Sequence, residues 1–263
     1  MPEEEWLLPV GALEKLNYVS PKSSFRKLRL FACACFAAVD IPLCEAEESQ
    51  IDFGEQAAES PNTCFGINMR FEWLAWREAN NKPTGGTQLP CIHDDPLSAA
   101  EESLFDSASL VAAVLDCPAT GHLYAEKITS RLRSLVWDLF GNPFRPVEIR
   151  KKCRRCAGVG RYKTVVYVGD GKSGRMDRHC QACRGVGWFQ PDWRSSRVIS
   201  LAQPAYDERL PSRELDTARL FVLSDAMEEE ADASLDIRLL EHLRSPGPHY
   251  RGCWALDLIL GKE

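Results

Sequence analysis

Apolar residues recur at helical spacing over most of the chain. The first clear series has intervals of three or four residues and consists of Phe25, Leu28, Phe31, Cys35 and Val39. Such intervals place side chains on one face of a helix. Ser24 is a suitable N-cap residue, and Pro42 is expected to stop the helix. We therefore expect a helix that buries this face and leaves Arg26, Lys27 and Arg29 exposed.

The same spacing predicts further helices on both sides of the middle of the chain. Their expected bounds are 45–59, 69–79, 97–115 and 121–140, followed by 196–208, 215–230, 234–243 and 253–260. Asp95 is the expected N-cap of 97–115, with Pro96 in the first turn, and Gly141 the expected C-cap of 121–140. Pro204 removes a backbone donor, which predicts a kink or a later start in 196–208. The fold class is therefore mainly α.

Residues 148–189 interrupt the helical pattern. Thr, Val and Tyr alternate with other residues over 161–168, and 175–179 can return as a partner strand after a glycine-rich turn at 169–174. The segment has no leucine and little apolar bulk, so its fold must depend on a metal. The sequence predicts a helical body made of residues 1–147 and 190–263, with a β-hairpin zinc-knuckle module inserted at 148–189.

Two octets frame this hairpin and share the pattern Cys-x-x-Cys-x-Gly-Val-Gly. They read CRRCAGVG at 153–160 and CQACRGVG at 180–187. A Cys-x-x-Cys turn places two thiolates at the separation that zinc prefers, and the glycines let the backbone turn away without a clash. The prediction is one structural Zn²⁺ bound by Cys153, Cys156, Cys180 and Cys183.

The alternatives to zinc are iron, a redox dithiol and unliganded thiols. A redox Cys-x-x-Cys normally stands alone at a strand-to-helix junction, whereas two copies occur here. His179 could compete as a ligand, but four cysteines complete the shell and leave no position for a reacting water. Seven of the eleven cysteines lie outside the octets, and we expect them to be free thiols in the core.

Charge is unevenly distributed along the chain. The whole chain has a net charge of −6, while 148–189 contains eleven Lys or Arg and three Asp or Glu, so this segment carries +8 and the remainder −14. A basic module on an acidic body is typical of a surface that contacts acidic partners. The candidate contact residues are Arg154, Arg155, Arg161, Lys163 and Arg178.

The octets resemble the cysteine-rich zinc module of DnaJ-type co-chaperones, whose repeats read Cys-x-x-Cys-x-Gly-x-Gly. The resemblance covers residues 153–187. The family module has four repeats and two zinc ions, whereas this chain has two repeats, enough for one ion. No His-Pro-Asp tripeptide occurs in the sequence, so the resemblance does not imply a J-domain or stimulation of a heat-shock chaperone.

The flanking segments resemble a second family, a large group of uncharacterised, mostly helical planctomycete proteins. The similar segments are RKLRLFACAC (26–35), LFGNPFRPV (139–147), LAQPAYDER (201–209) and PGPHYRGCWALDLILGK (246–262). In that family the piece ending FGNPFRPV is soon followed by the LAQ segment, which implies that residues 148 to about 190 are an insertion. The resemblance implies a helical fold and a bacterial origin. It gives no information on activity.

His249, Cys253 and Asp257 are spaced by four residues, which on a continuous helix would align a base, a thiol and a carboxylate. The proline and glycine before Cys253 indicate that the helix begins only there. A buried salt bridge, with Arg251 as a candidate partner, is the simpler explanation of Asp257. The sequence has no glycine-rich phosphate loop and no nucleophile elbow.

These observations predict a non-enzymatic zinc-binding adaptor. Its basic module, residues 148–189, is called the finger below and is expected to contact a protein partner, for example in a chaperone-like role. A nucleic-acid-binding finger is the alternative, because Tyr162, Tyr167 and Trp188 accompany the basic residues. An enzyme using His249, Cys253 and Asp257 is the third hypothesis. The acidic N-terminus and the lack of a run of 18 apolar residues predict a cytoplasmic protein with no membrane segment.

Overall fold

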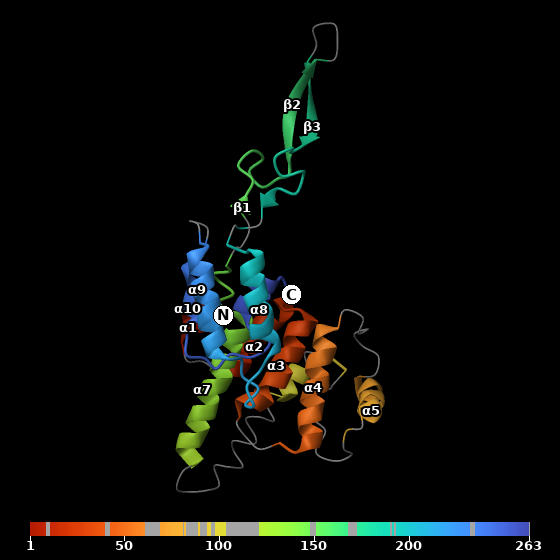
Figure 1. Ribbon diagram of the computed structural model, residues 1–263, viewed down its shortest axis with the longest axis vertical. Coiled ribbons are helices and arrows are strands. Elements are labelled where there is room, and N and C mark those ends of the chain that lie inside the picture. Colours follow the sequence, from red (N-terminus) through yellow and green to blue (C-terminus); the bar gives the residue numbers. More distant parts are fainter. Residues whose placement is uncertain are drawn as a thin grey trace.

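The structure is a computed structural model, and the described part of the chain is mainly α-helical (Figure 1). The described residues are 1–8, 11–39, 43–60, 69–80, 82, 89, 94–95, 98–103, 121–147, 151–167, 173–189, 191, 193–231 and 235–262. The N-terminal helices are α1 (Glu3–Leu7), α2 (Ala12–Val19), η1 (Ser20–Lys22), α3 (Phe25–Ala38), α4 (Glu45–Glu59), α5 (Met69–Ala79) and α7 (Gly121–Phe140), and residues 98–103 are also helical. The C-terminal helices are α8 (Ser196–Asp207), α9 (Thr217–Glu229), α10 (Ile237–Leu243) and α11 (Trp254–Leu260).

Periodicity placed most of these helices correctly. The bounds of α4, α5 and α7 coincide with the predicted ranges, and Ser24 caps α3 by accepting a hydrogen bond from the Lys27 backbone N–H at 3.3 Å. Asp95 caps residues 98–103 in the same way through Ser98 N–H, at 2.7 Å. Pro42, His93 and the remainder of the predicted 97–115 helix lie outside the described residues.

Pro204 does not delay the start of α8, so the predicted later start is wrong. The helix begins at Ser196, where Ser195 caps it by accepting from the Val198 N–H at 3.2 Å. Pro204 stands in the last turn, so its missing donor costs a single hydrogen bond near the helix end. Its carbonyl still accepts from the N–H of Glu208 at 3.0 Å.

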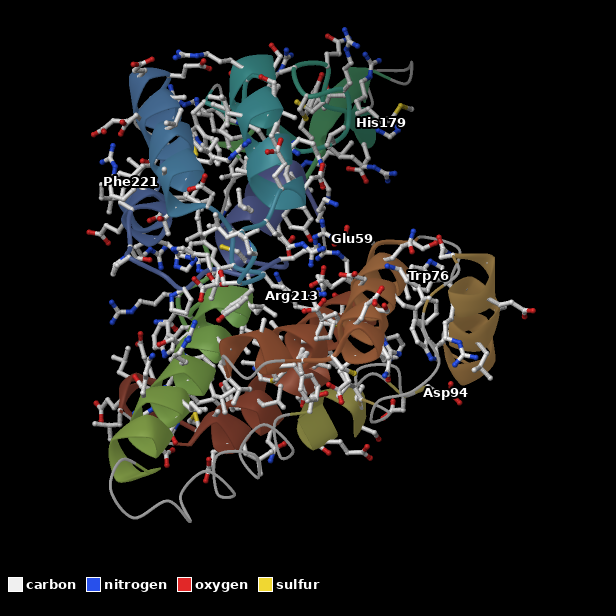
Figure 2. The ribbon with its side chains drawn as sticks, turned by 60° about the horizontal axis from the view of Figure 1, so that its bottom comes forward. Glu59, Trp76, Asp94, His179, Arg213 and Phe221 are labelled. Atoms are coloured by element: carbon white, nitrogen blue, oxygen red, sulfur yellow. The ribbon has the colours of Figure 1, made fainter. Side chains whose placement is uncertain are left out.

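Three apolar clusters hold the helical body together. The first joins α1, α2, α3 and α7, and the second joins the opposite side of α3 to α4 and α5. Within the second, Trp73 is buried and Trp76, labelled in Figure 2, packs on Phe53 with ring centroids 5.7 Å apart, so the aromatic residues of α5 belong to the core. The third cluster joins α8, α9, α10 and α11 around Trp193.

The position of α3 between two clusters corrects the predicted exposure of its polar face. Arg26 and Arg29 are buried, with 8% and 3% exposure, while Phe25 at the start of the helix is 52% exposed. A single buried stripe was assumed for this helix, but α3 is covered by neighbouring elements on several sides. Its basic side chains are therefore inside and require partners.

Arg26 finds its partners at a polar seam between the N-terminal and C-terminal helices. Its guanidinium donates to both carboxylate oxygens of Asp257 on α11 at 2.9 Å. It also donates at 2.8 Å to Glu59 at the end of α4, which is labelled in Figure 2. Lys27 also contacts Asp257. Burial opposes the charge, yet the hydrogen bonds and charge of Asp257 raise the pKa of Arg26, so its guanidinium stays charged. The predicted salt bridge of Asp257 is present, but its partner is not Arg251, which contacts Glu55 instead.

The segment between α7 and α8 projects away from the helices (Figure 1). Its base is a pair of short antiparallel strands, β1 (Lys151–Lys152) and β4 (Trp188–Phe189). The tip is an antiparallel hairpin of β2 (Arg161–Tyr167) and β3 (Ser173–His179). The predicted hairpin is confirmed, and residues 168–172 of its turn lie outside the described chain. None of the described helices is long and apolar enough to cross a bilayer.

Candidate metal centre

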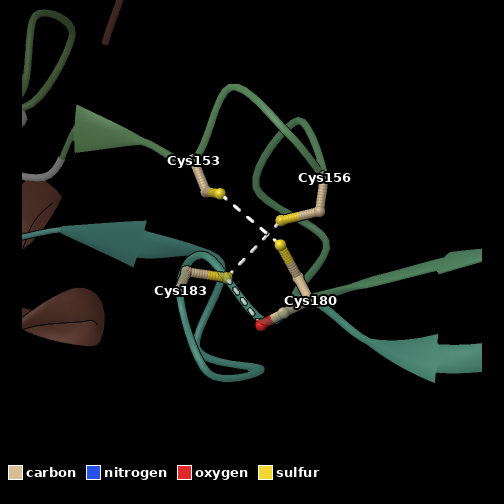
Figure 3. A group of neighbouring side chains, drawn as sticks. All are labelled: Cys153, Cys156, Cys180 and Cys183. Carbon is tan, nitrogen blue, oxygen red and sulfur yellow. Dashed lines mark hydrogen bonds between the residues drawn. The ribbon is translucent and has the colours of Figure 1, made fainter.

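The four cysteines of the octets converge between the two small sheets (Figure 3). The Sγ atoms of Cys153 and Cys180 are 3.7 Å apart, and those of Cys156 and Cys183 are 3.6 Å apart. All four Sγ atoms lie within 4.8 Å of one another, and all four residues are buried. Neighbouring sulfurs of a tetrahedral site with metal–sulfur bonds of about 2.3 Å are separated by a similar distance. This group can therefore bind a metal ion such as zinc.

Each octet forms one knuckle of the site, residues 153–160 and residues 180–187. An offset of 27 residues relates the two knuckles and pairs each cysteine of the first octet with one of the second. The same offset relates their backbone hydrogen bonds. Cys153 N–H donates to the Gly187 carbonyl and Cys180 N–H donates to the Gly160 carbonyl, both at 2.8 Å. The octets therefore form a pseudo-symmetric pair, in which each knuckle fixes the end of the other.

Backbone donors also point at the sulfur atoms. Gly160 N–H donates to Cys156 Sγ at 3.3 Å, and Gly187 N–H donates to Cys183 Sγ at 3.1 Å. Such contacts stabilise a thiolate over a thiol. Backbone N–H groups, that of Cys183 first, lower the pKa of Cys180 to about 7. Burial acts in the opposite direction on the neighbouring thiol and raises the pKa of Cys153 to about 11. Cys180 is therefore the more readily deprotonated of these two thiols, and metals bind the deprotonated form.

The last glycine of each octet has no room for a side chain. A Cβ atom on Gly160 would stand 2.1 Å from the Gly185 carbonyl oxygen, and one on Gly187 would stand 2.2 Å from the Gly158 carbonyl oxygen. Both residues also have positive φ, at +75° and +87°. The glycines that the pattern singled out are therefore required where the two knuckles meet.

His179 is not part of the thiol group. It is exposed and pairs with Arg161 in the hairpin register, and its ring lies beside Gly185. The described cysteines outside the octets form no disulfide, and Cys33, Cys35 and Cys253 are buried as predicted. Cys44 is the exception among them, because it is exposed at the N-cap of α4.

The five predicted contact residues are all exposed, but they do not share one face. Alternation along the hairpin places Arg161 and Lys163 on one side of the ribbon and Arg178, which is opposite Tyr162, on the other. Arg155 lies over the Tyr162 ring, with its guanidinium carbon 5.3 Å from the centroid. Positive charge therefore surrounds the finger instead of forming a single track.

Two of the three aromatic residues predicted to contact nucleic acid are partly covered, and the side chain of the third, Tyr167, lies outside the described residues. Tyr162 and Trp188 are half-buried, and cations cover both rings, since Lys152 Nζ lies 5.6 Å from the Trp188 centroid. Among the described side chains of the finger, the most exposed large apolar residues are Val159 at 74% and Val186 at 69%. They occupy the same position in the two octets, and the preceding Gly158 and Gly185 direct the chain outwards with positive φ.

His249, Cys253 and Asp257 do not come together as a trio. Helix α11 begins at Trp254 with Cys253 as its N-cap, as predicted, and Asp257 is held by Arg26. His249 and Cys253 instead join two residues that the sequence did not single out, Asp138 of α7 and His242 of α10. No local signal marks Asp138 and His242, because they are separated by 104 residues.

Comparisons with protein-family models, with curated proteins and with solved structures find no match to this chain. The similarities to DnaJ-type modules and to planctomycete proteins therefore remain predictions from the sequence. The metal centre is supported by its own geometry.

Proposed function

We propose that this protein is a zinc-binding interaction protein without enzymatic activity, in which the finger binds one structural Zn²⁺ and contacts an acidic surface of a protein partner. Four thiolates fill the tetrahedral shell of zinc and leave no open position for a substrate or an activated water. The metal then has a structural role. It holds the two knuckles together and presents the hairpin.

The observation that carries the partner assignment is the exposure of Val159 and Val186 at equivalent points of the two knuckles, among exposed arginines. Apolar side chains beside Arg are typical of protein interfaces, where Arg pairs with carboxylates and the apolar contact excludes water. A single-stranded nucleic acid instead requires free aromatic faces on which bases can stack. Lys152 and Arg155 already occupy the faces of Trp188 and Tyr162 in this finger.

The metal is tested by elemental analysis of protein purified without chelator. We expect about one equivalent of zinc to be lost when Cys153 and Cys180 are both replaced by serine, because two ligands of four do not retain the ion. Iron in place of zinc, or an unchanged metal content in the double variant, would contradict this part of the proposal.

The partner is tested by affinity capture from a bacterial extract with the full chain and with Arg154→Glu/Arg155→Glu. A matched control is Lys22→Glu/Lys127→Glu, which changes the net charge by the same amount at exposed positions of the body. We expect proteins that survive nuclease treatment to be captured by the wild type and the control but not by the finger variant. Equal capture by all three would contradict a role for the finger.

The same capture experiment distinguishes a protein partner from a nucleic acid. Capture that disappears with nuclease, together with retention of single-stranded DNA that falls steeply between about 50 and 200 mM salt, would favour that alternative. A Val159→Ser/Val186→Ser variant gives an independent readout. Loss of capture without a change in net charge is expected only for a protein interface.

A further inference from the structure

A second cluster of metal-binding side chains lies inside the helical body, at the seam between α7 and the helices α10 and α11. Its members are Asp138, His242, His249 and Cys253, and one potential ligand atom from each lies within 4.8 Å of all the others. His242 Nε2 is 3.1 Å from Cys253 Sγ and 3.2 Å from Asp138 Oδ1. A thiolate, two imidazoles and a carboxylate are the ligand types that zinc prefers.

The contacts of His249 place its inward nitrogen against the carboxylate of Asp138. Nδ1 is 2.7 Å from Asp138 Oδ1. Nε2 lies 3.1 Å from the hydroxyl and 3.2 Å from the carbonyl oxygen of Ser245. The outward nitrogen therefore has hydrogen-bond partners outside the cluster, and Nδ1 is the nitrogen that faces the other three residues.

Asp138 is oriented by a partner on its other oxygen. Oδ2 accepts from the Tyr250 backbone N–H at 2.8 Å, which leaves Oδ1 directed at the two histidines. The contacts of His249 Nε2 with Ser245 have the same role, because hydrogen bonds from outside the ligand shell fix the orientation of a metal ligand. We propose that Asp138, His242, His249 and Cys253 bind a second zinc ion.

A catalytic triad explains the same residues less well. In a triad the carboxylate holds the histidine nitrogen that is remote from the nucleophile. Here a single nitrogen of His242 faces both Cys253 and Asp138.

Three of the four residues of the cluster are buried, and only His242 is partly exposed to solvent. The side chains of Asp138 and His249 are 3% and 1% exposed and Cys253 is fully buried, whereas the side chain of His242 is 18% exposed. His242 borders a broad cavity that Trp254 of the body and Trp188 of the finger also line. An ion can enter from this cavity. Once bound it would join α7 to the C-terminal helices across 104 to 111 residues of chain.

The test uses the full chain in which Cys153→Ser and Cys180→Ser have removed the finger site. We expect this background to retain about one equivalent of zinc of the two present in the wild type, and to lose it when His242→Ala is added. His179→Ala is the matched control, because His179 is exposed and lies outside the cluster. It should change nothing. Circular dichroism at 222 nm confirms that each variant is folded.

Cobalt substitution gives a readout that needs no change in the cluster itself. Co²⁺ in the same background should show the visible absorption of a tetrahedral ion, with weaker sulfur-to-metal charge transfer than the four-thiolate finger of the wild type. A folded background protein with less than about a fifth of an equivalent of zinc and no tetrahedral cobalt spectrum would overturn the proposal. Zinc retained in full after His242→Ala would overturn it as well. Neither result depends on whether the finger binds a partner.

Discussion

The finger and the helical body reach a defined structure by different means. In the finger, the buried cluster consists of four cysteines with Tyr162 packed against them, and most other described side chains are exposed. The body is held by three apolar clusters, two of which share α3, and by ion pairs buried between them. The comparison teaches that one chain can contain two parts whose stabilities respond to different perturbations.

The largest expected effect is the loss of one metal ligand. Cys180→Ser should abolish zinc binding at the finger and with it the fold of residues 151–189, since structural zinc contributes about 10–16 kcal/mol of apparent binding free energy to small domains. The signal at 222 nm from the body should stay nearly unchanged. Cys44→Ser is the control, because Cys44 is an exposed free thiol. A body that unfolds with Cys180→Ser would show that the two parts are not independent.

The second largest effect should destabilise the helical body and leave the finger unchanged. Arg26→Met removes the bidentate partner of Asp257 and a partner of Glu59, while Lys27 stays in contact with Asp257. The cost should therefore lie toward or below the lower end of the roughly 3–5 kcal/mol that removal of one member of a buried ion pair costs. Urea unfolding followed at 222 nm measures the loss, while the zinc content of the finger should not change. Arg197→Met removes an exposed ion pair with Glu229 and should cost about 0–1 kcal/mol.

A smaller effect, confined to the finger, distinguishes two of its glycines. Gly158→Ala has ordinary space around the new Cβ, with the nearest atom at 3.5 Å, and should cost about 1–2 kcal/mol for its positive φ alone. Gly160→Ala adds a clash with a backbone oxygen at 2.1 Å and should weaken zinc binding further. Competition with a chelator ranks the two variants. Equal affinities would contradict the close approach of the knuckles.

The smallest effect concerns the acid stability of the body. Burial alone would raise the pKa of Glu59, but hydrogen bonds from Lys262, Tyr206 and Arg26 lower it below its ordinary value of 4.5. A carboxyl group with a depressed pKa contributes stability above its unfolded-state pKa, and that stability is lost as the pH falls through the folded-state value. Urea midpoints at 222 nm should therefore fall below about pH 4.5. Glu59→Gln should be less stable at neutral pH and should show a shallower fall.

Local sequence patterns predicted the helices, the four-cysteine site and the hairpin, because each of these depends on residues that are close together in the sequence. Helix α7 was found from residue spacing and Gly141 as its C-cap, which has φ +64°. The four-cysteine site was found because each pair of ligands lies within one turn and the two turns repeat. Hairpin strands between them followed from the length of the connection and its β-branched residues.

What the sequence could not reveal depends on partners far along the chain. Arg26 was expected outside because a spacing rule assumes one buried face, and its carboxylate partner is 231 residues away. Asp138 looked like an ordinary polar residue of an amphipathic helix, yet it is buried against His249 after 111 residues. Such pairings are set by the packing of whole helices, and no window of sequence contains both members.

The ion pair between Arg26 and Asp257 also determines the order in which the contacts of Arg26 can form while the chain is being synthesised. At about 5–20 residues per second, the 231 residues that separate the two side chains take roughly 10–50 s to make. During that interval Glu59, 33 residues after Arg26, is the nearer partner of the two. A nascent chain that still lacks α11 can therefore pair Arg26 with Glu59, and the bidentate contact with Asp257 forms only after α11 has been made.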